Sequence, residues 1–259
     1  MIYVPSKGRA ATCVTAKNLM DEGVPFRLVL EAQDVSLYRE YFQDTEILTL
    51  PESDKGIPYV RQWIKTYSRL AGEASHLQVD DNIRWFGVRE EGKNIKRPAK
   101  EVLSLLSDRV AEYSNVAIAS LCQTTFAWTH QKEVSVNRQA YSCVWVRNDV
   151  EADWRDNTQE DTDYSLQVLK LGWCTMVFNR LLMDKIPSTH LRGGNTEMYL
   201  DGGRERRALG LQTDWPDFRT GVRYGKFTTL PSSIWKTFPQ RPRKDNVPLV
   251  PPPWQGRLF

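Results

Sequence analysis

The alternation of strands and helices in the first eighty residues constrains this chain most. Short apolar, strand-like runs at 2–4, 25–31, 46–50 and 77–79 are separated by segments whose apolar residues recur at helical spacing. Strands that alternate with helices favour a largely parallel sheet covered by helices on both faces. The sequence therefore predicts an α/β fold with a mostly parallel, mixed sheet flanked by helices.

The acidic segment Asp80-Asp81-Asn82 follows the fourth strand directly. Two carboxylates and an amide are poor strand residues, but they are good oxygen ligands for Mg²⁺ or Mn²⁺. Open α/β folds bind ligands in the crevice at the carboxyl ends of their strands. We therefore interpret Asp80 and Asp81 as metal ligands that carry a diphosphate. A turn or helix cap built from the same residues is the structural alternative.

The loop Pro5-Ser6-Lys7-Gly8-Arg9 leaves the first strand, and a helix is predicted after it over 10–22. A small hydroxyl, a glycine and two cations at a strand's carboxyl end suit a phosphate or a nucleotide. The spacing matches neither a Walker loop nor G-x-G-x-x-G, so a basic surface turn is the alternative. The second strand ends in an acid, Glu31.

A second acidic group, Glu160-Asp161-Thr162-Asp163, begins a predicted helix. Acids are favoured there by the helix dipole and need no catalytic reason. A carboxylate near the sheet's carboxyl edge is also suited to act as general base for a hydroxyl acceptor. Asp161 is the first choice for this base and Glu160 the second. His190 precedes a glycine-containing loop that is suited to close over a bound ligand, although a lone histidine is usually structural.

The carboxyl-terminal part of the chain is basic, whereas the rest is slightly acidic. Residues 204–259 contain eleven Lys and Arg and four acids, a net charge of +7, which leaves about −4 for 1–203. Cations neutralise phosphates and aromatic rings stack on bases, so the mixture in 213–226 suits nucleic acid. An ordinary subdomain with a solvated basic face is the alternative. The candidate DNA contacts are Arg192, Trp215, Arg219, Arg223, Tyr224 and Lys226, and Phe218 is a further stacking candidate.

The four cysteines lie far apart without a C-x-x-C pair, which is typical of reduced thiols. No secretory signal and no run long enough to span a bilayer is visible. We expect a cytoplasmic protein with no membrane partner. We expect one domain over 1–200 and a basic, aromatic and proline-rich extension over 201–259, packed on the same domain.

The loop at 5–9, the strand end at 78–83 and the helix start at 160–164 together resemble those of GT-A type nucleotide-sugar glycosyltransferases. Within that group the chain most resembles the phage glycosyltransferases of the TET-associated family. The resemblance covers roughly residues 1–200. It implies a GT-A-like fold, a UDP-sugar donor, a divalent metal, Mn²⁺ or Mg²⁺, and a phage-infected host cell as the setting.

The resemblance also implies roles for individual residues. Asp80 and Asp81 would match the metal-binding acidic motif, although Asn82 stands where a strict D-x-D pattern has an acid. Asp161 would activate the acceptor, and His190 would be a late metal ligand. The residues that would line the nucleotide pocket are Pro5, Ser6, Arg9, Glu31 and Asp80.

The leading hypothesis is transfer of a sugar to the hydroxymethyl group of 5-hydroxymethylcytosine or 5-hydroxymethyluracil in DNA. A base in duplex DNA must be flipped out first, and Trp215, Phe218 or Tyr224 would stack in its place. Two alternatives stay open. One is a nucleotide-sugar glycosyltransferase that acts on a glycan or a small molecule, and the other is a DNA-binding protein without enzymatic activity.

Overall fold

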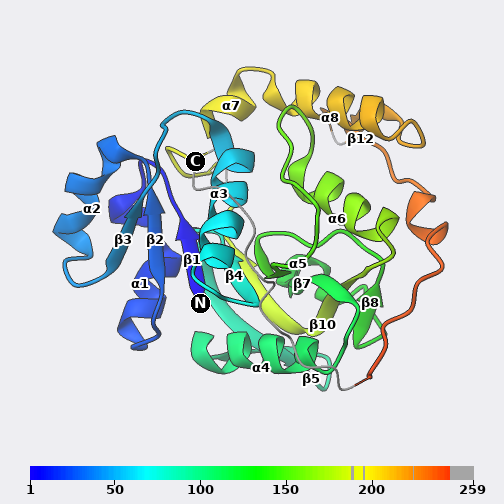
Figure 1. Cartoon of the computed structure of the whole chain (residues 1–259), viewed down its shortest axis with the longest axis horizontal. Helices are drawn as coiled ribbons and strands as arrows, with labels where there is room; N and C mark the ends of the chain where they lie inside the picture. The colour runs from blue at the N-terminus through cyan, green and yellow to red at the C-terminus, as the bar shows by residue number, and fades with distance from the viewer. Residues whose placement is uncertain (188–189, 195, 224, 246–259) are drawn as a thin grey trace.

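The computed structural model describes residues 1–187, 190–194, 196–223 and 225–245. In these ranges the chain forms a ten-stranded sheet with helices on both faces, and a separate two-stranded hairpin (Figure 1). The strands of the large sheet are β1 (Ile2–Pro5), β2 (Arg27–Leu30), β3 (Glu46–Thr49), β4 (Ser75–Val79), β5 (Ile83–Glu90), β6 (Lys93–Arg97), β7 (Val116–Gln123), β8 (Val134–Val136), β9 (Cys143–Arg147) and β10 (Cys174–Lys185). The helices are α1 (Val14–Asp21), α2 (Val35–Tyr41), α3 (Gly56–Leu70), α4 (Ala99–Ala111), α5 (Thr124–Ala127), α6 (Glu160–Lys170), α7 (Thr196–Leu200) and α8 (Gly203–Asp214). The hairpin is β11 (Thr220–Arg223) and β12 (Lys226–Thr229).

The first four strands are parallel and lie in the order β3-β2-β1-β4. The chain proceeds from β1 to β2 and β3 on one side, and then crosses to the other side of β1 to form β4. The direction of winding therefore reverses between β1 and β4. In α/β sheets, the crevice outside the carboxyl ends of two such strands is where ligands bind.

The second half of the sheet is mixed, and it completes the order β4-β9-β7-β10-β5-β6. β9 runs antiparallel to both of its neighbours, so β7 and β10 point in the same direction as β4. β10 is long because parallel pairing with β7 holds its first part and antiparallel pairing with β5 holds residues 181–185. β5 and β6 were not indicated by the sequence pattern. The length of β10 places Lys185 at the same edge of the sheet as Asp80. The predicted α/β class with a mixed sheet flanked by helices is confirmed.

Helices cover both faces of the sheet. Both faces carry apolar side chains, because successive side chains of β1 point in opposite directions. Ile2 and Val4 point into the main core with α1 and α4, whereas Tyr3 points to the opposite face, under α3. On this second face α6 packs on β7 and β9 through a separate cluster that includes Tyr164 and Val168. The second face therefore brings the amino-terminal turn of α6 and the body of α3 above the carboxyl ends of the strands.

The first helix is shorter than predicted. α1 begins at Val14 instead of residue 10, after a 3-10 turn at Ala10–Thr12. Its first turn is fixed by Thr15, whose backbone N–H donates to the carbonyl of Asp81 (3.2 Å) and whose hydroxyl donates to the carbonyl of Asp80 (2.6 Å). The start of the helix is therefore set by the acidic turn after β4, a contact that local propensity does not encode.

The carboxyl-terminal extension packs on α6. Leu211 of α8, Phe218 and Ile234 are buried together with Leu166 of α6. The boundary predicted at residue 200 stays a prediction, but the described part of the extension shares a buried cluster with the sheet-bearing part of the chain. Within the described ranges, no helix combines the length and the apolar character that a bilayer span requires.

Candidate active site

A cavity of about 390 Å³ lies at the reversal point between β1 and β4. Its walls come from the loop after β1, the turn after β4, the amino-terminal turn of α6, the end of β10 and α8. Eight of the residues predicted from the sequence line it: Pro5, Ser6, Arg9, Glu31, Asp80, Asp81, Glu160 and Asp161. The structure therefore gathers four separate sequence segments into one site.

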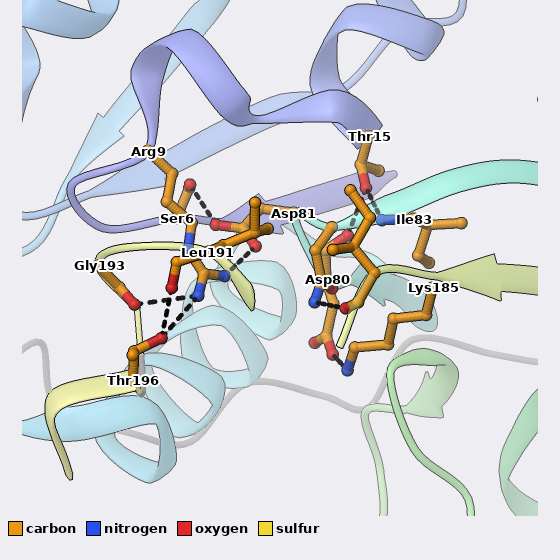
Figure 2. A network of polar contacts seen from close by, with 12 residues as sticks. Ser6, Arg9, Thr15, Asp80, Asp81, Ile83, Lys185, Leu191, Gly193 and Thr196 are labelled. Carbon is orange, nitrogen blue, oxygen red and sulfur yellow. Dashed lines mark hydrogen bonds and ion pairs between the residues drawn. The ribbon is translucent and has the colours of Figure 1, made fainter. Parts of the chain in front are cut away.

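Asp81 is held by the loop after β1 (Figure 2). Its carboxylate accepts hydrogen bonds from Nη1 of Arg9 (2.8 Å) and from the hydroxyl of Ser6 (2.5 Å). Asp81 is 5% exposed and Arg9 is 5% exposed. Burial raises the pKa of Asp81, although Arg9 and Ser6 oppose this effect. Asp81 is thus an internal counter-ion for Arg9.

Arg9 also ties the late glycine loop to the beginning of the chain. It donates from Nε to the carbonyl of Arg192 (3.0 Å) and from Nη2 to the carbonyl of Gly193 (2.9 Å). Gly193 and Gly194 have positive φ values, and a Cβ atom on Gly194 would lie 2.7 Å from the guanidinium carbon of Arg9. The close approach therefore requires glycine at this position.

Asp80 lies between two cations. Its Oδ2 accepts from Nζ of Lys185 (2.5 Å), its Oδ1 accepts from Nη2 of Arg61 (3.1 Å), and Lys185 also donates to the hydroxyl of Ser142 (2.7 Å). Burial alone would raise the pKa of Asp80, but Lys185 and Arg61 outweigh it and hold the pKa below its usual value. Asp80 is therefore an anion that fixes one buried and one half-buried cation at the cavity wall.

Asp161 stands at the start of α6, above Arg61. The Oδ1 atom of Asp161 lies 3.6 Å from Nη2 of Arg61, and it has no hydrogen-bond partner among the described residues. Burial raises the pKa of Asp161 to about 7, because Glu160 and Asp80 add to the effect of burial and outweigh Arg61. A carboxylate with this pKa in a cavity has the properties of a general base.

Glu160, the second candidate base, is engaged differently. Its Oε2 atom lies 2.6 Å from Nη2 of Arg207, which α8 contributes. Tyr199 of α7 lines the cavity nearby, and burial raises its pKa. Glu160 therefore attaches the extension to the site, whereas Asp161 keeps an unused oxygen.

Glu31, predicted to line the nucleotide pocket, is buried and lines the cavity. It accepts from Nζ of Lys7 (2.9 Å), from the side chain of Gln33 (2.6 Å) and from the backbone N–H of Asp54 (2.9 Å). These bonds order the loop after β3 against the loop after β1. The sequence marked Glu31 only as the acid that ends β2.

A divalent metal does not fit the acidic pair. The carboxylate oxygens of Asp80 and Asp81 already accept from Lys185, Arg61, Arg9 and Ser6. Among the described residues, no group of three or more His, Cys, Asp or Glu side chains is arranged to hold a metal ion. Asn82, in the third place of the motif, donates to the carbonyl of Ile186 (2.7 Å). The predicted metal site therefore stays a prediction that these contacts do not support.

His190 is exposed and does not line the cavity described here. Its predicted part in metal binding depended on the loop that follows it. That loop instead supplies the two carbonyls that Arg9 holds. A role for His190 stays a prediction.

The predicted DNA contacts divide into exposed and internal residues. Arg192, Arg219, Arg223 and Lys226 are exposed, the last three on or beside the β11–β12 hairpin. Trp215 is half-buried and donates its indole N–H to Asp163 (2.8 Å). The structure contradicts the stacking role of Phe218, because its ring is 4% exposed and packs with α6 and α8. Tyr224 lies outside the described residues.

Sequence reasoning missed three cavity cations and an exposed aromatic pair. The cations Lys185, Arg61 and Arg207 had no motif to mark them, since each comes from the interior or the end of a regular element. Phe126 and Trp128, in and after α5, are 50% and 74% exposed. Burial raises the pKa of half-buried Tyr141, and Cys122 and Asp161 add to this effect. α5 begins directly after β7, and Thr124 in its first turn donates to Asp184 of β10 (2.7 Å), so the aromatic pair follows the same edge of the sheet as Lys185.

The family model described as TET-Associated Glycosyltransferase matches residues 1–194. This range ends at the glycine that contacts the Arg9 loop. No curated protein matches the chain significantly.

Among solved structures, a putative nucleotide-diphospho-sugar transferase from Desulfovibrio desulfuricans G20 is similar, with a TM-score of 0.45, 8% identity, and coverage of 78% of this chain and 94% of that one. GalNAc-T7 with UDP, GalNAc and Mn²⁺ gives a TM-score of 0.49 and 5% identity, and covers 72% of this chain and 43% of that one. Mannose-1-phosphate geranyltransferase from Thermus thermophilus gives a TM-score of 0.35 and 11% identity, and covers 69% of this chain and 57% of that one.

Proposed function

The chain belongs to the TET-associated glycosyltransferase family, and we propose that it moves a sugar from a UDP-linked donor to the hydroxymethyl group of a modified pyrimidine in DNA. The observation that carries the proposal is the placement of Asp161. Its carboxyl group has a pKa raised to about 7, its side chain is partly exposed, and it lines the same cavity as the cations Arg61 and Lys185. A base that shares a cavity with cations suits transfer from a nucleotide diphosphate to a hydroxyl.

The donor is proposed to bind along the carboxyl ends of β1, β2 and β4. The loop of Pro5, Ser6 and Lys7, with Glu31 behind it, would hold the nucleoside, and the basic wall near Asp80 would hold the diphosphate. The cavity offers both a carboxylate that can accept from a ribose hydroxyl and several cations that attract phosphate. This arrangement supports a nucleotide-sugar donor.

In the proposed reaction the acceptor's hydroxymethyl oxygen attacks the anomeric carbon of the sugar. A new carbon–oxygen bond forms there while the bond from that carbon to the diphosphate oxygen breaks. The electron pair of the broken bond leaves with UDP, and Asp161 takes the proton of the acceptor hydroxyl. This is the route of an inverting transferase. The divalent metal that the family resemblance implies has no part in this step, because the carboxylates of Asp80 and Asp81 are engaged by other side chains.

For the acceptor, we propose that DNA contacts the exposed cations Arg219, Arg223 and Lys226 and that Trp128 stacks on an unpaired base. The cations would neutralise phosphates, and the open face of an indole suits stacking. The indole of Trp128 is held by a hydrogen bond to the carbonyl of Thr125 (2.9 Å), so its ring is oriented before a base arrives. Trp128 would then replace Phe218, which is buried, as the stacking residue.

The test is to incubate the protein with UDP-sugars and DNA that contains hydroxymethylated or unmodified pyrimidines. We expect UDP release that depends on the hydroxymethyl group, and a mass increase of one sugar on the modified nucleoside. Equal UDP release with and without modified DNA would reject the acceptor. Transfer to a free glycan in the absence of DNA would favour the glycan alternative.

A further inference from the structure

We propose that Lys185 and Arg61 hold the diphosphate of the donor in place of a divalent cation, so that nucleotide binding needs no metal. The inference rests on the proposed function, because it concerns the leaving group of the same reaction. It follows from the disagreement between the acidic motif, which suggests a metal, and the contacts that this motif makes.

Lys185 is fixed with one hydrogen-bonding group left for a ligand. An ammonium group carries three N–H donors. Two of them meet Asp80 (2.5 Å) and Ser142 (2.7 Å), and Lys185 lines the cavity. Asp80 also keeps the pKa of Lys185 above its ordinary value despite burial. Lys185 is thus a permanent, oriented cation at the cavity wall.

Arg61 adds a second cation that is not fully satisfied. It is 2% exposed, it lines the cavity, and its Nη2 atom contacts both Asp80 and Asp161. Its Nε atom is buried without a hydrogen-bond partner among the described residues. The positive charge of Arg61 is therefore fixed at the cavity wall, where it attracts an anion.

The charges at this wall favour an anion over a metal. Asp80 is one carboxylate between two cations, so these three groups carry one net positive charge, which Asp161 balances when it is ionised. A dication at Asp80 would have to displace Lys185 or Arg61 and would be repelled by the cation that remained. Asp81 offers no substitute, because Arg9 and Ser6 occupy its oxygens. A diphosphate complements the same wall without breaking any of these contacts.

In the transfer step these residues supply charge and no proton. As the bond between the sugar and the diphosphate oxygen breaks, the electron pair moves onto that oxygen. Lys185 and Arg61 stay protonated and strengthen their hydrogen bonds to the developing negative charge. The proton of the acceptor hydroxyl goes to Asp161, so the balance of the reaction is complete without a further group.

The experiment measures binding of UDP and of inorganic pyrophosphate to the full chain by calorimetry, in EDTA and in Mn²⁺. We expect the Kd of the wild-type protein for UDP to differ by less than roughly threefold between the two conditions. Lys185→Met should weaken UDP binding in EDTA by roughly tenfold or more, whereas Lys185→Arg should retain most of it. Lys100→Met, an exposed lysine on α4, is the matched control and should bind as the wild type.

A second measurement does not depend on the variants folding. Mn²⁺ is titrated into the wild-type protein and followed by the paramagnetic resonance of the free ion. No stoichiometric site is expected. UDP binding that requires Mn²⁺, or one tightly bound Mn²⁺ per chain, would overturn the inference while the UDP-sugar donor stood.

The outcomes separate the inference from the proposed function. If pyrophosphate binds in EDTA and requires Lys185, but UDP binds no better than pyrophosphate, the basic site stands and the UDP-sugar donor is rejected. If neither probe binds under either condition, both proposals are rejected.

Discussion

The donor cavity and the β11–β12 hairpin are both rich in cations, but they use them in opposite ways. In the cavity, Arg9 and Arg61 are buried, and each contacts a carboxylate at a fixed distance. On and beside the hairpin, Arg219, Arg223 and Lys226 are exposed to solvent. Buried, paired charges fix the geometry of a binding site, whereas exposed charges attract a polyanion at a distance and are screened by salt. We therefore expect substitutions in the two regions to affect different steps.

The largest expected effect belongs to Asp161. Asp161→Asn keeps the shape but removes the base, and we expect transfer to fall by about 10²- to 10⁴-fold. UDP binding, measured by calorimetry, should change little. Glu160→Gln is the comparison, because Glu160 is paired with Arg207. If Glu160→Gln reduced the rate as strongly and Asp161→Asn did not, the assignment of the base would be reversed.

Loss of a buried ion pair should destabilise the protein, whereas replacement of an exposed cation should not. Arg9→Met leaves Asp81 buried without its counter-ion, and we expect the free energy of unfolding to fall by about 3–5 kcal/mol. Arg219→Met on the exposed hairpin is the matched control and should change it by less than about 0.5 kcal/mol. Urea unfolding measures both. Equal losses would remove the distinction between the two regions.

The pH dependence of the transfer rate should follow the ionisation of Asp161. Because the base must be ionised and its pKa is about 7, the rate should fall about tenfold per pH unit below 7 and level off above it. The effect on stability has the opposite sign. The folded state holds a proton that the unfolded chain releases from about pH 3.8, so this group lowers stability as pH rises from about 3.8 to 7. A rate that stays flat between pH 5 and 8 would exclude Asp161 as the base.

Substitution of Trp128 tests whether DNA also contacts the protein outside the β11–β12 hairpin. Trp128→Ala should weaken binding of single-stranded DNA by about 1–3 kcal/mol, the usual value of one stacked base. UDP affinity should not change. Fluorescence anisotropy of labelled DNA gives the affinity, and Tyr41→Ala, an exposed ring on α2, is the control. Equal losses in the two variants would indicate non-specific stacking.

Substitution of the cations on and beside the hairpin should give the smallest loss of DNA affinity per residue. Replacement of Arg219, Arg223 and Lys226 by alanine should weaken DNA binding severalfold at physiological salt. It should reduce the slope of log K against log salt by about 2 to 3, because three phosphate contacts are lost. The hairpin would have no part in binding if the salt slope matched that of the wild-type protein.

The sequence predicted the parallel half of the fold well, because strand–helix alternation is a local pattern. It also brought the acids at 80–81 and 160–161 to the same edge of the sheet. It did not predict Lys185, because β10 continues only through pairing with β5, whose residues are distant along the chain. The same limit explains Phe218. Phe218 lies close to basic residues in the sequence, which suggested an exposed ring, but its contacts with α6 bury that ring.

The contact of Arg9 with residues 192 and 193 has a consequence for how the protein is made. The Arg9 guanidinium and two of its carbonyl acceptors are separated by more than 180 residues, so the acceptors emerge from the ribosome long after Arg9. Until then the nucleotide pocket lacks part of its wall, although the strands beneath it can already pair. Completion of the pocket therefore follows synthesis of the strands beneath it, and a nascent chain released before Gly194 would leave the pocket open.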